Sequence, residues 1–190
     1  MTGITCALGP SPRATVELAV RWAGGHGWPV SLDPNHRPQL WTDEEARAAL
    51  LPLVARCSVL LLSVEDAELL FATAEPGAAI ARAHGARARI VVLKRGALGA
   101  VASDGKVTVE VPAVDVAEPV DPVGAGDAFD AGFVAALLRR GDDLGGALAV
   151  GAHAGACAVR VTGEHTGCPR LADLPGDLKA LFAPASTPPA

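Results

Sequence analysis

The feature that most constrains the fold is a regular alternation of short apolar runs with longer stretches of helical spacing. Apolar runs of strand length occur at Val30–Leu32, Val59–Leu62 and Ile90–Leu93, and helical sequence separates each from the next. Strands that alternate with helices in this way pair in parallel, because a helical crossover carries the chain back along the sheet. We therefore predict an α/β fold with a mostly parallel, doubly wound sheet and helices on both of its faces.

The remaining segments complete this prediction. Ile4–Leu8 is predicted as a strand, and Pro12–Ala23 as a helix whose apolar residues are Val16, Leu18, Ala19 and Trp22. Thr42, with Glu45 three positions later, forms a capping box that begins a helix. Further helices are predicted at 65–71, 77–84, 127–140 and 144–161 and near residue 178, and a hairpin is predicted at 100–111 around Asp104-Gly105.

Length and charge limit the class of protein and its partners. The 190 residues are 50% hydrophobic and 19% charged, which predicts one globular domain over residues 1–182 and a Pro/Ala tail over 183–190. With 16 Lys and Arg against 21 Asp and Glu, the chain lacks the basic excess of a nucleic-acid-binding protein. Residues 1–10 have no signal-peptide pattern, and the uncharged stretch 145–159 is too short to span a bilayer. We expect a cytoplasmic protein with no nucleic-acid or membrane partner.

The four cysteines form no CxxC pair, so their spacing does not indicate a disulfide framework. His153 and Cys157 are one helical turn apart, and His165 and Cys168 follow closely; all four are residue types that bind zinc. The small residues around His153 favour the other interpretation, in which this helix packs tightly and holds no metal. Metal analysis of the purified protein distinguishes the two.

Residues 121–129, DPVGAGDAF, carry the clearest chemical signal. Gly124, Ala125 and Gly126 let a ligand approach the backbone at the start of the predicted helix, where free amides and the helix dipole favour an anion. Asp127 fits such a site if its carboxylate takes a proton from an attacking hydroxyl, as in phosphoryl transfer. The alternative is purely structural: Asp127 occupies the first helical turn, as acidic residues often do, and the glycines shape a turn.

This stretch resembles the C-terminal signature of the ribokinase/PfkB carbohydrate kinases, DTxGAGD, with Pro122 in place of Thr. The DPVGAGDAF form is most similar to the 2-keto-3-deoxygluconate kinase branch. The resemblance implies that Asp127 is the catalytic base and also binds the substrate, and that residues 124–126 form the anion hole. It also implies ATP and Mg²⁺, and it leaves open a monovalent cation near Asp121 and Val123.

Three further segments resemble parts of the same family in order and spacing. Ser63 and Asp66 stand where the family has NxxE, which implies ATP binding by Ser63 and an indirect role for Asp66 with Mg²⁺. A plain acidic helix start is the alternative there. The turn KRGALG implies nucleotide contacts, as does the late helix near Ala152, whose small residues equally suit close helix packing. The residues of these two segments predicted to bind ATP are Lys94, Gly96, Ala97, Gly99 and Ala152.

Residues 33–41, DPNHRPQLW, are similar to the DxNxRxxLW segment of the same branch, which implies that Asn35 and Arg37 bind the substrate. A guanidinium offers two parallel hydrogen bonds to a carboxylate, which a 2-keto sugar acid carries. The alternative is that Arg37 pairs with a surface acid.

Together these segments imply an ATP-dependent kinase for a sugar or sugar acid, and three hypotheses remain open. The resemblance covers only the C-terminal part of the family fold, so we expect the N-terminal strands and the lid to be missing, together with the dimer contact that the lid commonly forms. The chain is then an active sugar-acid kinase most like the 2-keto-3-deoxygluconate kinases, a truncated nucleotide-binding module that is inactive alone, or a kinase for another sugar or a nucleoside. A Rossmann oxidoreductase is disfavoured, because no GxGxxG follows the first strand.

Overall fold

A computed structural model describes residues 1–141, 143–163 and 165–183. The chain divides into two compact units. The N-terminal unit comprises Met1–Gly96 and Ala100–Val109, and the C-terminal unit comprises Ala97–Gly99 and Glu110–Ala190. Residues 184–190 of the predicted tail lie outside the described residues. The domain bounds 1–182 and 183–190 therefore stay a prediction.

The sheet follows the chain strictly in order. Its strands are β1 (Ser31–Leu32), β2 (Val59–Ser63), β3 (Ile90–Lys94), β4 (Ala100–Ser103) and β5 (Thr108–Val111). The first three pair in parallel, with Leu60 opposite Leu32 on one side and Val91 on the other, whereas β4 runs antiparallel to β3. The predictions of a mixed α/β fold with a mostly parallel sheet and of a hairpin around Asp104 are confirmed.

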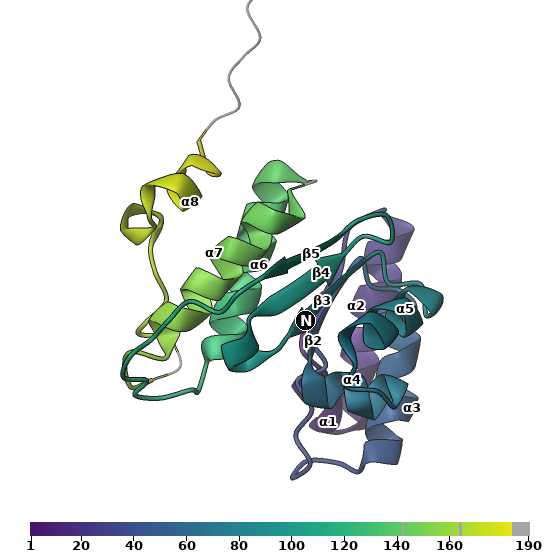
Figure 1. The fold of residues 1–190 in the computed structure, drawn as a ribbon. Helices are drawn as coiled ribbons and strands as arrows, with labels where there is room; N and C mark the ends of the chain where they lie inside the picture. Colours follow the sequence, from purple (N-terminus) through teal and green to yellow (C-terminus); the bar gives the residue numbers. More distant parts are fainter. Residues whose placement is uncertain (142, 164, 184–190) are drawn as a thin grey trace, which may run out of the picture. The chain divides into compact units, whose positions relative to one another are not determined.

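Five helices belong to the N-terminal unit: α1 (Gly3–Ala7), α2 (Pro10–Gly25), α3 (Asp43–Val54), α4 (Val64–Phe71) and α5 (Pro76–Gly85). Figure 1 shows them as the purple to teal helices beside β2 and β3. Alternate residues of these strands, such as Leu60 and Leu93, join Leu50 and Leu70 of the helices in one buried cluster. Burial of this apolar surface is the main force that holds the helices on the sheet.

The capping box predicted at Thr42 is present at the start of α3. The Thr42 hydroxyl accepts a hydrogen bond from the Glu45 amide (3.3 Å), and the Glu45 carboxylate accepts one from the Thr42 amide (2.9 Å). The hydrogen bonds that Thr42 donates stabilise the charged form of the Glu45 carboxylate. They therefore lower the pKa of Glu45 below its ordinary value.

The strand predicted over Ile4–Leu8 is wrong. Residues 4–7 lie in the helix α1, and Leu8 is its C-cap residue. The residues just before them pair with the sheet instead: Thr2 bridges Asp33 in parallel, and the Gly3 amide donates to the Asp33 carbonyl oxygen. The Thr2 hydroxyl then caps the helix by accepting from the Ile4 amide. A short apolar run cannot distinguish a strand from a buried helical turn, and here the cap decides.

The apolar face predicted for α2 is also partly wrong. Val16 and Val20, four positions apart, are buried, whereas the side chains of Leu18 and Trp22 are more than half exposed. Residues four apart share one helix face, and Leu18 lies two positions from each valine, on the far side. Trp22 packs on the surface against Trp28, with ring centroids 4.8 Å apart.

The C-terminal unit contains the helices α6 (Ala125–Arg140), α7 (Leu144–Ala158) and α8 (Gly176–Ala180). Figure 1 shows α6 and α7 in green, side by side along their length. They approach closely because Gly132 of α6 faces Ala154 of α7. The helix predicted over 144–161 ends at Ala158. Phe129 and Phe133 lie on the buried face of α6, whereas Leu138 is exposed.

Candidate active site

Polar residues lie at or directly after the ends of the three parallel strands of the N-terminal unit. Ser63 and Lys94 are the last residues of β2 and β3, where they lie opposite one another, and Asp33 directly follows β1. Ligands of parallel α/β sheets bind outside the carboxyl ends of the strands. The structure therefore brings the predicted residues Asn35, Arg37, Ser63, Asp66 and Lys94 to the edge of the sheet where a ligand is expected.

A buried ion pair joins two of these strand ends. The Lys94 ammonium lies 2.7 Å from Oδ2 of Asp33, and the two side chains are only 14% and 11% exposed. The other Asp33 oxygen accepts a hydrogen bond from the Asn35 amide at 2.8 Å. Lys94, predicted to bind ATP, is thus attached to the segment predicted to bind the substrate.

Asp66 connects the start of α4 to the same segment. Its Oδ2 accepts hydrogen bonds from the amide and hydroxyl of Ser63, and its Oδ1 accepts one from the His36 amide at 3.1 Å. Both carboxylate oxygens therefore have protein donors, and Ser63 with Asp66 forms a complete capping box. The acidic helix start considered from the sequence is present. The roles of Ser63 with ATP and of Asp66 with Mg²⁺ stay predictions.

Arg37 presents its guanidinium to solvent. The side chain is exposed, and its Nη1 donates to the His36 carbonyl oxygen at 3.0 Å. Among the described residues, no carboxylate oxygen lies within 4.0 Å of its guanidinium nitrogens. The segment after it is anchored by buried Trp41, over whose ring the Arg13 guanidinium lies. Arg37 is therefore accessible to an anionic ligand.

The glycine turn after β3 requires its glycines for backbone reasons. Gly96 and Gly99 have φ of +56° and +85°, in the region that side chains disfavour. A Cβ at Gly99 would lie 2.1 Å from the Val111 carbonyl oxygen. Close packing thus accounts for Gly99, and the nucleotide contacts of Gly96, Ala97 and Gly99 stay predictions.

In the C-terminal unit, the loop 121–127 leads directly into α6. Gly124 is the N-cap residue, with φ +80° and ψ −6°. The Ala125 amide donates to the Pro122 carbonyl oxygen, whereas the following first-turn amides have no acceptor within the helix. Asp121 holds the loop, because its two oxygens accept from the amides of Val123 and Gly163. Free amides at the start of a 16-residue helix are suited to an anion.

Asp127 lies in the first turn of α6 with its side chain exposed. The N-cap residue Gly124 provides no side chain, and α6 begins without a side-chain capping hydrogen bond. The carboxylate is thus accessible at the same helix end as the free amides. A general base must reach the proton of its substrate, and an exposed carboxylate is compatible with that; the catalytic role of Asp127 stays a prediction.

The small residues of α7 divide between two roles. A Cβ at Gly151 or Gly155 would lie 3.0–3.1 Å from a carbonyl oxygen of α6, so these glycines serve close helix packing. Ala152 is half-buried, and its contact with the nucleotide stays a prediction. His153 Nε2 lies 3.5 Å from Cys157 Sγ, but in the described part of the chain no three metal-binding side chains cluster.

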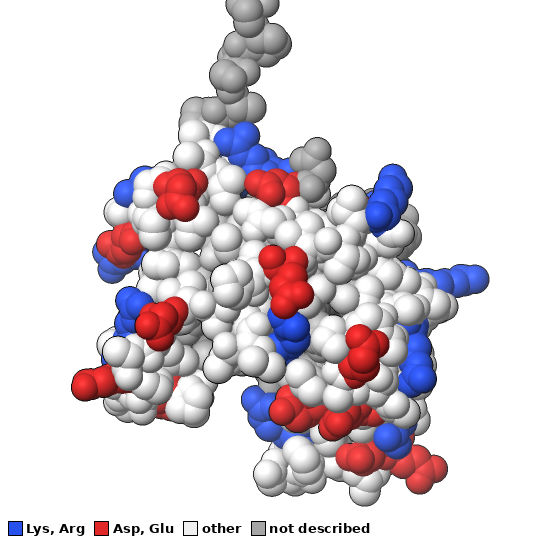
Figure 2. All heavy atoms as spheres, in the orientation of Figure 1, with Lys and Arg blue, Asp and Glu red and all other residues white. Residues whose placement is uncertain are grey.

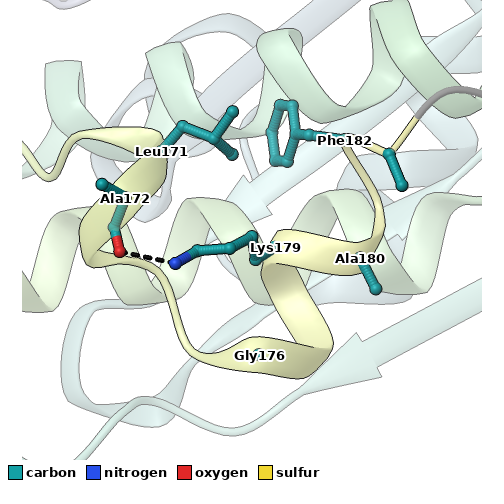
Figure 3. Close-up of a pocket in the computed structure, with 7 residues that line it drawn as sticks. Leu171, Ala172, Gly176, Lys179, Ala180 and Phe182 are labelled. Carbon is teal, nitrogen blue, oxygen red and sulfur yellow. Dashed lines mark hydrogen bonds between the residues drawn. The ribbon is translucent and has the colours of Figure 1, made fainter.

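A separate apolar hollow lies at the end of the described chain (Figure 3). Leu171, Phe182 and Ala180 line it, and the Lys179 ammonium donates to the Ala172 carbonyl oxygen at 2.6 Å. None of the predicted site residues lines this hollow, so it is distinct from both groups described above.

The distribution of charge and the length of the helices bear on the expected partners. Figure 2 shows acidic and basic side chains interspersed on the visible face. Over residues 1–141, 143–163 and 165–183, every helix is too short or too polar to cross a bilayer.

A sheet whose first three strands are parallel and carry polar residues at their ends, together with a glycine-capped helix and an exposed first-turn aspartate, places the chain in the α/β class. Residues 3–170 match the pfkB family carbohydrate kinases, and the chain belongs to that family. The family assignment made from the DPVGAGD segment is thus confirmed.

Individual relatives are named as kinases of sugars and sugar acids. The chain is 34% identical over 146 residues to a 2-dehydro-3-deoxygluconokinase of Dickeya dadantii strain 3937. The matched region covers 74% of this chain and 47% of that protein. It is similar to a putative ribokinase II from E. coli solved with ATP and Mg²⁺, with TM-score 0.82, 28% identity, and coverage of 95% and 56%. A fructokinase from Vibrio cholerae O395, solved with fructose, ADP and calcium ion, gives TM-score 0.82, 26% identity, and coverage of 96% and 59%. The chain therefore spans about half the length of these relatives.

Sequence reasoning assigned no role to two residues that hold the site together. Asp33 connects Lys94 to the Asn35 amide, and His36 provides the amide that Asp66 binds. Asp33 was visible as the first residue of the DxNxR segment, and its position directly after a buried strand was the available signal. Its partner Lys94 is 61 positions away, beyond the reach of any local pattern.

Proposed function

We propose that this protein is an ATP-dependent kinase that phosphorylates a hydroxyl of a sugar acid, of the 2-keto-3-deoxygluconate type. The observation that carries the proposal is the start of α6, where free first-turn amides follow Gly124 and the exposed Asp127 carboxylate lies beside them. An anion site and a base at one helix end are what phosphoryl transfer to an alcohol requires. Membership of the pfkB family supports the same reaction.

In the proposed reaction, the Asp127 carboxylate takes the proton of the sugar hydroxyl. The hydroxyl oxygen forms a bond to the γ-phosphorus of ATP, and the bond from that phosphorus to the bridging oxygen breaks to release ADP. The backbone at Gly124, Ala125 and Gly126 stabilises the negative charge of the transferred group. Such preorganised donors are most effective at the charge that develops in the transition state.

The other predicted residues bind the two substrates. Arg37, with Asn35, holds the sugar-acid carboxylate, for which its exposed guanidinium is suited. The nucleotide is held by Ser63, Lys94, Gly96, Ala97, Gly99 and Ala152. Mg²⁺, when bound with ATP, neutralises phosphate charge, and Asp66 supports this only indirectly because both of its oxygens have protein donors. Any monovalent cation would bind near Asp121 and Val123.

The catalytic proposal is tested with Asp127→Asn. We expect ADP release that depends on 2-keto-3-deoxygluconate to fall about 10²–10⁴-fold, because general-base catalysis typically contributes that factor. The matched control is Asp177→Asn, which changes an exposed first-turn aspartate of α8 and should leave the rate unchanged. Equal rates in wild-type protein and Asp127→Asn would exclude Asp127 as the base.

The substrate class is tested with Arg37→Ala. The affinity for a sugar acid should fall by about 1.5–3 kcal/mol, the usual value of a hydrogen bond to a charged group. The affinity for a neutral sugar such as fructose should stay the same. Arg56→Ala, which removes another exposed arginine, is the control. If Arg37→Ala lost equal affinity for acid and neutral sugars, Arg37 would not recognise the carboxylate. That result would favour a kinase for another sugar.

A second candidate function rests on which part of the relatives the chain matches: it spans about half of each relative compared above, and the residues predicted to bind ATP lie within that half. In this alternative, the chain is a nucleotide-binding module that is inactive by itself. The ADP-release assay with ATP alone and with a panel of sugar acids distinguishes the two. Binding of ATP without sugar-dependent ADP release would favour the module.

A further inference from the structure

We propose that Asp33 is a positioning residue that connects the predicted nucleotide side of the site to the predicted substrate side. Asp33, Asn35 and Arg37 lie on the loop after β1, which we call the substrate loop (residues 33–37). Lys94 lies at the end of β3, and β2 separates these two strands in the sheet. The Asp33–Lys94 ion pair therefore crosses the end of β2 and attaches the loop to a strand that is not its neighbour.

The ion pair is buried enough for each charge to depend on the other. With the side chains 11% and 14% exposed, little water is present to replace a missing partner. Removal of one member of a buried pair leaves an uncompensated charge, which rearranges to reach solvent. Loss of the Lys94 charge should therefore displace Asp33 even though nothing on the substrate loop is altered.

Displacement of Asp33 affects the substrate loop through its backbone. Asn35 has φ +45°, a left-handed conformation that surrounding contacts must maintain. Asp33 maintains it by accepting the Asn35 amide, and Asp66 accepts the next amide, that of His36. Two carboxylates thus accept hydrogen bonds from the amides of the two residues before Arg37. The exposed Arg37 side chain depends on them for its position.

The consequence is that Lys94 controls affinity for the sugar acid although it does not belong to the substrate loop. This consequence rests on the proposed function, in which Arg37 binds the substrate carboxylate. The ion pair and its effect on the substrate loop can be tested without any ligand.

The ligand experiment is calorimetric titration with 2-keto-3-deoxygluconate in the absence of nucleotide. Asp33→Asn and Lys94→Met should each weaken binding about tenfold, and the double variant should be no weaker than either single one, because all three break the same link. Lys94→Arg, which keeps the charge, should retain most of the affinity. Asp104→Asn is the matched control: Asp104 also accepts two backbone amides but lies in an exposed turn.

Two results would overturn the proposal: sugar-acid affinity unchanged in Lys94→Met, or losses in the two single variants that multiply in the double one. If the wild-type protein binds no sugar acid, the proposed function fails, and hydrogen exchange of the free protein decides the inference. The Asn35 and His36 amides should then exchange faster in Lys94→Met than in wild-type protein and in Asp104→Asn. Equal exchange rates in all three would show that the ion pair does not hold the substrate loop.

Discussion

At the residue scale, burial determines how the cysteines behave. Cys57 is almost fully buried, and its thiol donates to the Val54 carbonyl oxygen. Burial in this apolar setting raises the pKa of Cys57 to about 12, and burial also raises the pKa of Cys6. Cys168, in contrast, is exposed. Because the thiolate is the reactive form, these residues should differ in reactivity.

We predict that at pH 8 a water-soluble aromatic disulfide labels Cys168 quickly and Cys57 only when the N-terminal unit opens. With a pKa of about 12, only about one Cys57 thiol in 10⁴ is ionised at that pH. Mass spectrometry of the peptides measures each rate, and urea should accelerate Cys57 far more than Cys168. Cys168→Ser should remove the fast phase. Labelling of Cys57 in native protein as fast as that of Cys168 would contradict the burial described above.

Single residues also show the limit of sequence reasoning at this scale. Thr42 and Glu45 were predicted as a capping box, because both partners lie within one helical turn. The ion pair between Asp33 and Lys94 was not predicted, because its members meet only through the order of the strands. Local spacing reveals the first kind of interaction and cannot reveal the second.

At the element scale, the packing of α6 on α7 depends on glycine. A Cβ at Gly132 would lie 3.0 Å from both the Ala154 Cβ and the Val150 carbonyl oxygen. Neither atom belongs to a flexible side-chain end, so neither can move away cheaply. The sequence left two interpretations of the small residues on α7, and the structure supports helix packing for Gly151 and Gly155.

We predict that Gly132→Ala destabilises the protein by about 1–3 kcal/mol, the usual cost of overpacking a close contact. The matched control is Gly24→Ala in α2, where nothing lies within 4 Å of the new Cβ. That change should instead stabilise the protein by up to about 1 kcal/mol, because alanine favours helix over glycine. Urea unfolding followed by circular dichroism measures both. Equal effects of the two substitutions would contradict the close approach of α6 and α7.

The elements themselves were predicted well where a strong cap or a long period marked them, as at α3 and α6. The prediction failed at Ile4–Leu8, where five apolar or small residues suited a strand as well as a helical turn. It also failed for the exposed Leu18 and Trp22, because hydrophobic character alone does not show which face of α2 packs against the core.

At the scale of the whole molecule, the sequence by itself determined the α/β class, the three parallel strands and the family. Each of these depends on local information: the period of apolar residues, the length of a crossover, and a motif of nine consecutive residues. Only the tertiary structure decided that Asp66 binds the His36 amide, that Lys94 reaches Asp33, and that Gly132 faces Ala154. These contacts join residues 22 to 61 positions apart. Such contacts form because folding brings strand ends and helix faces together, and no local pattern encodes them.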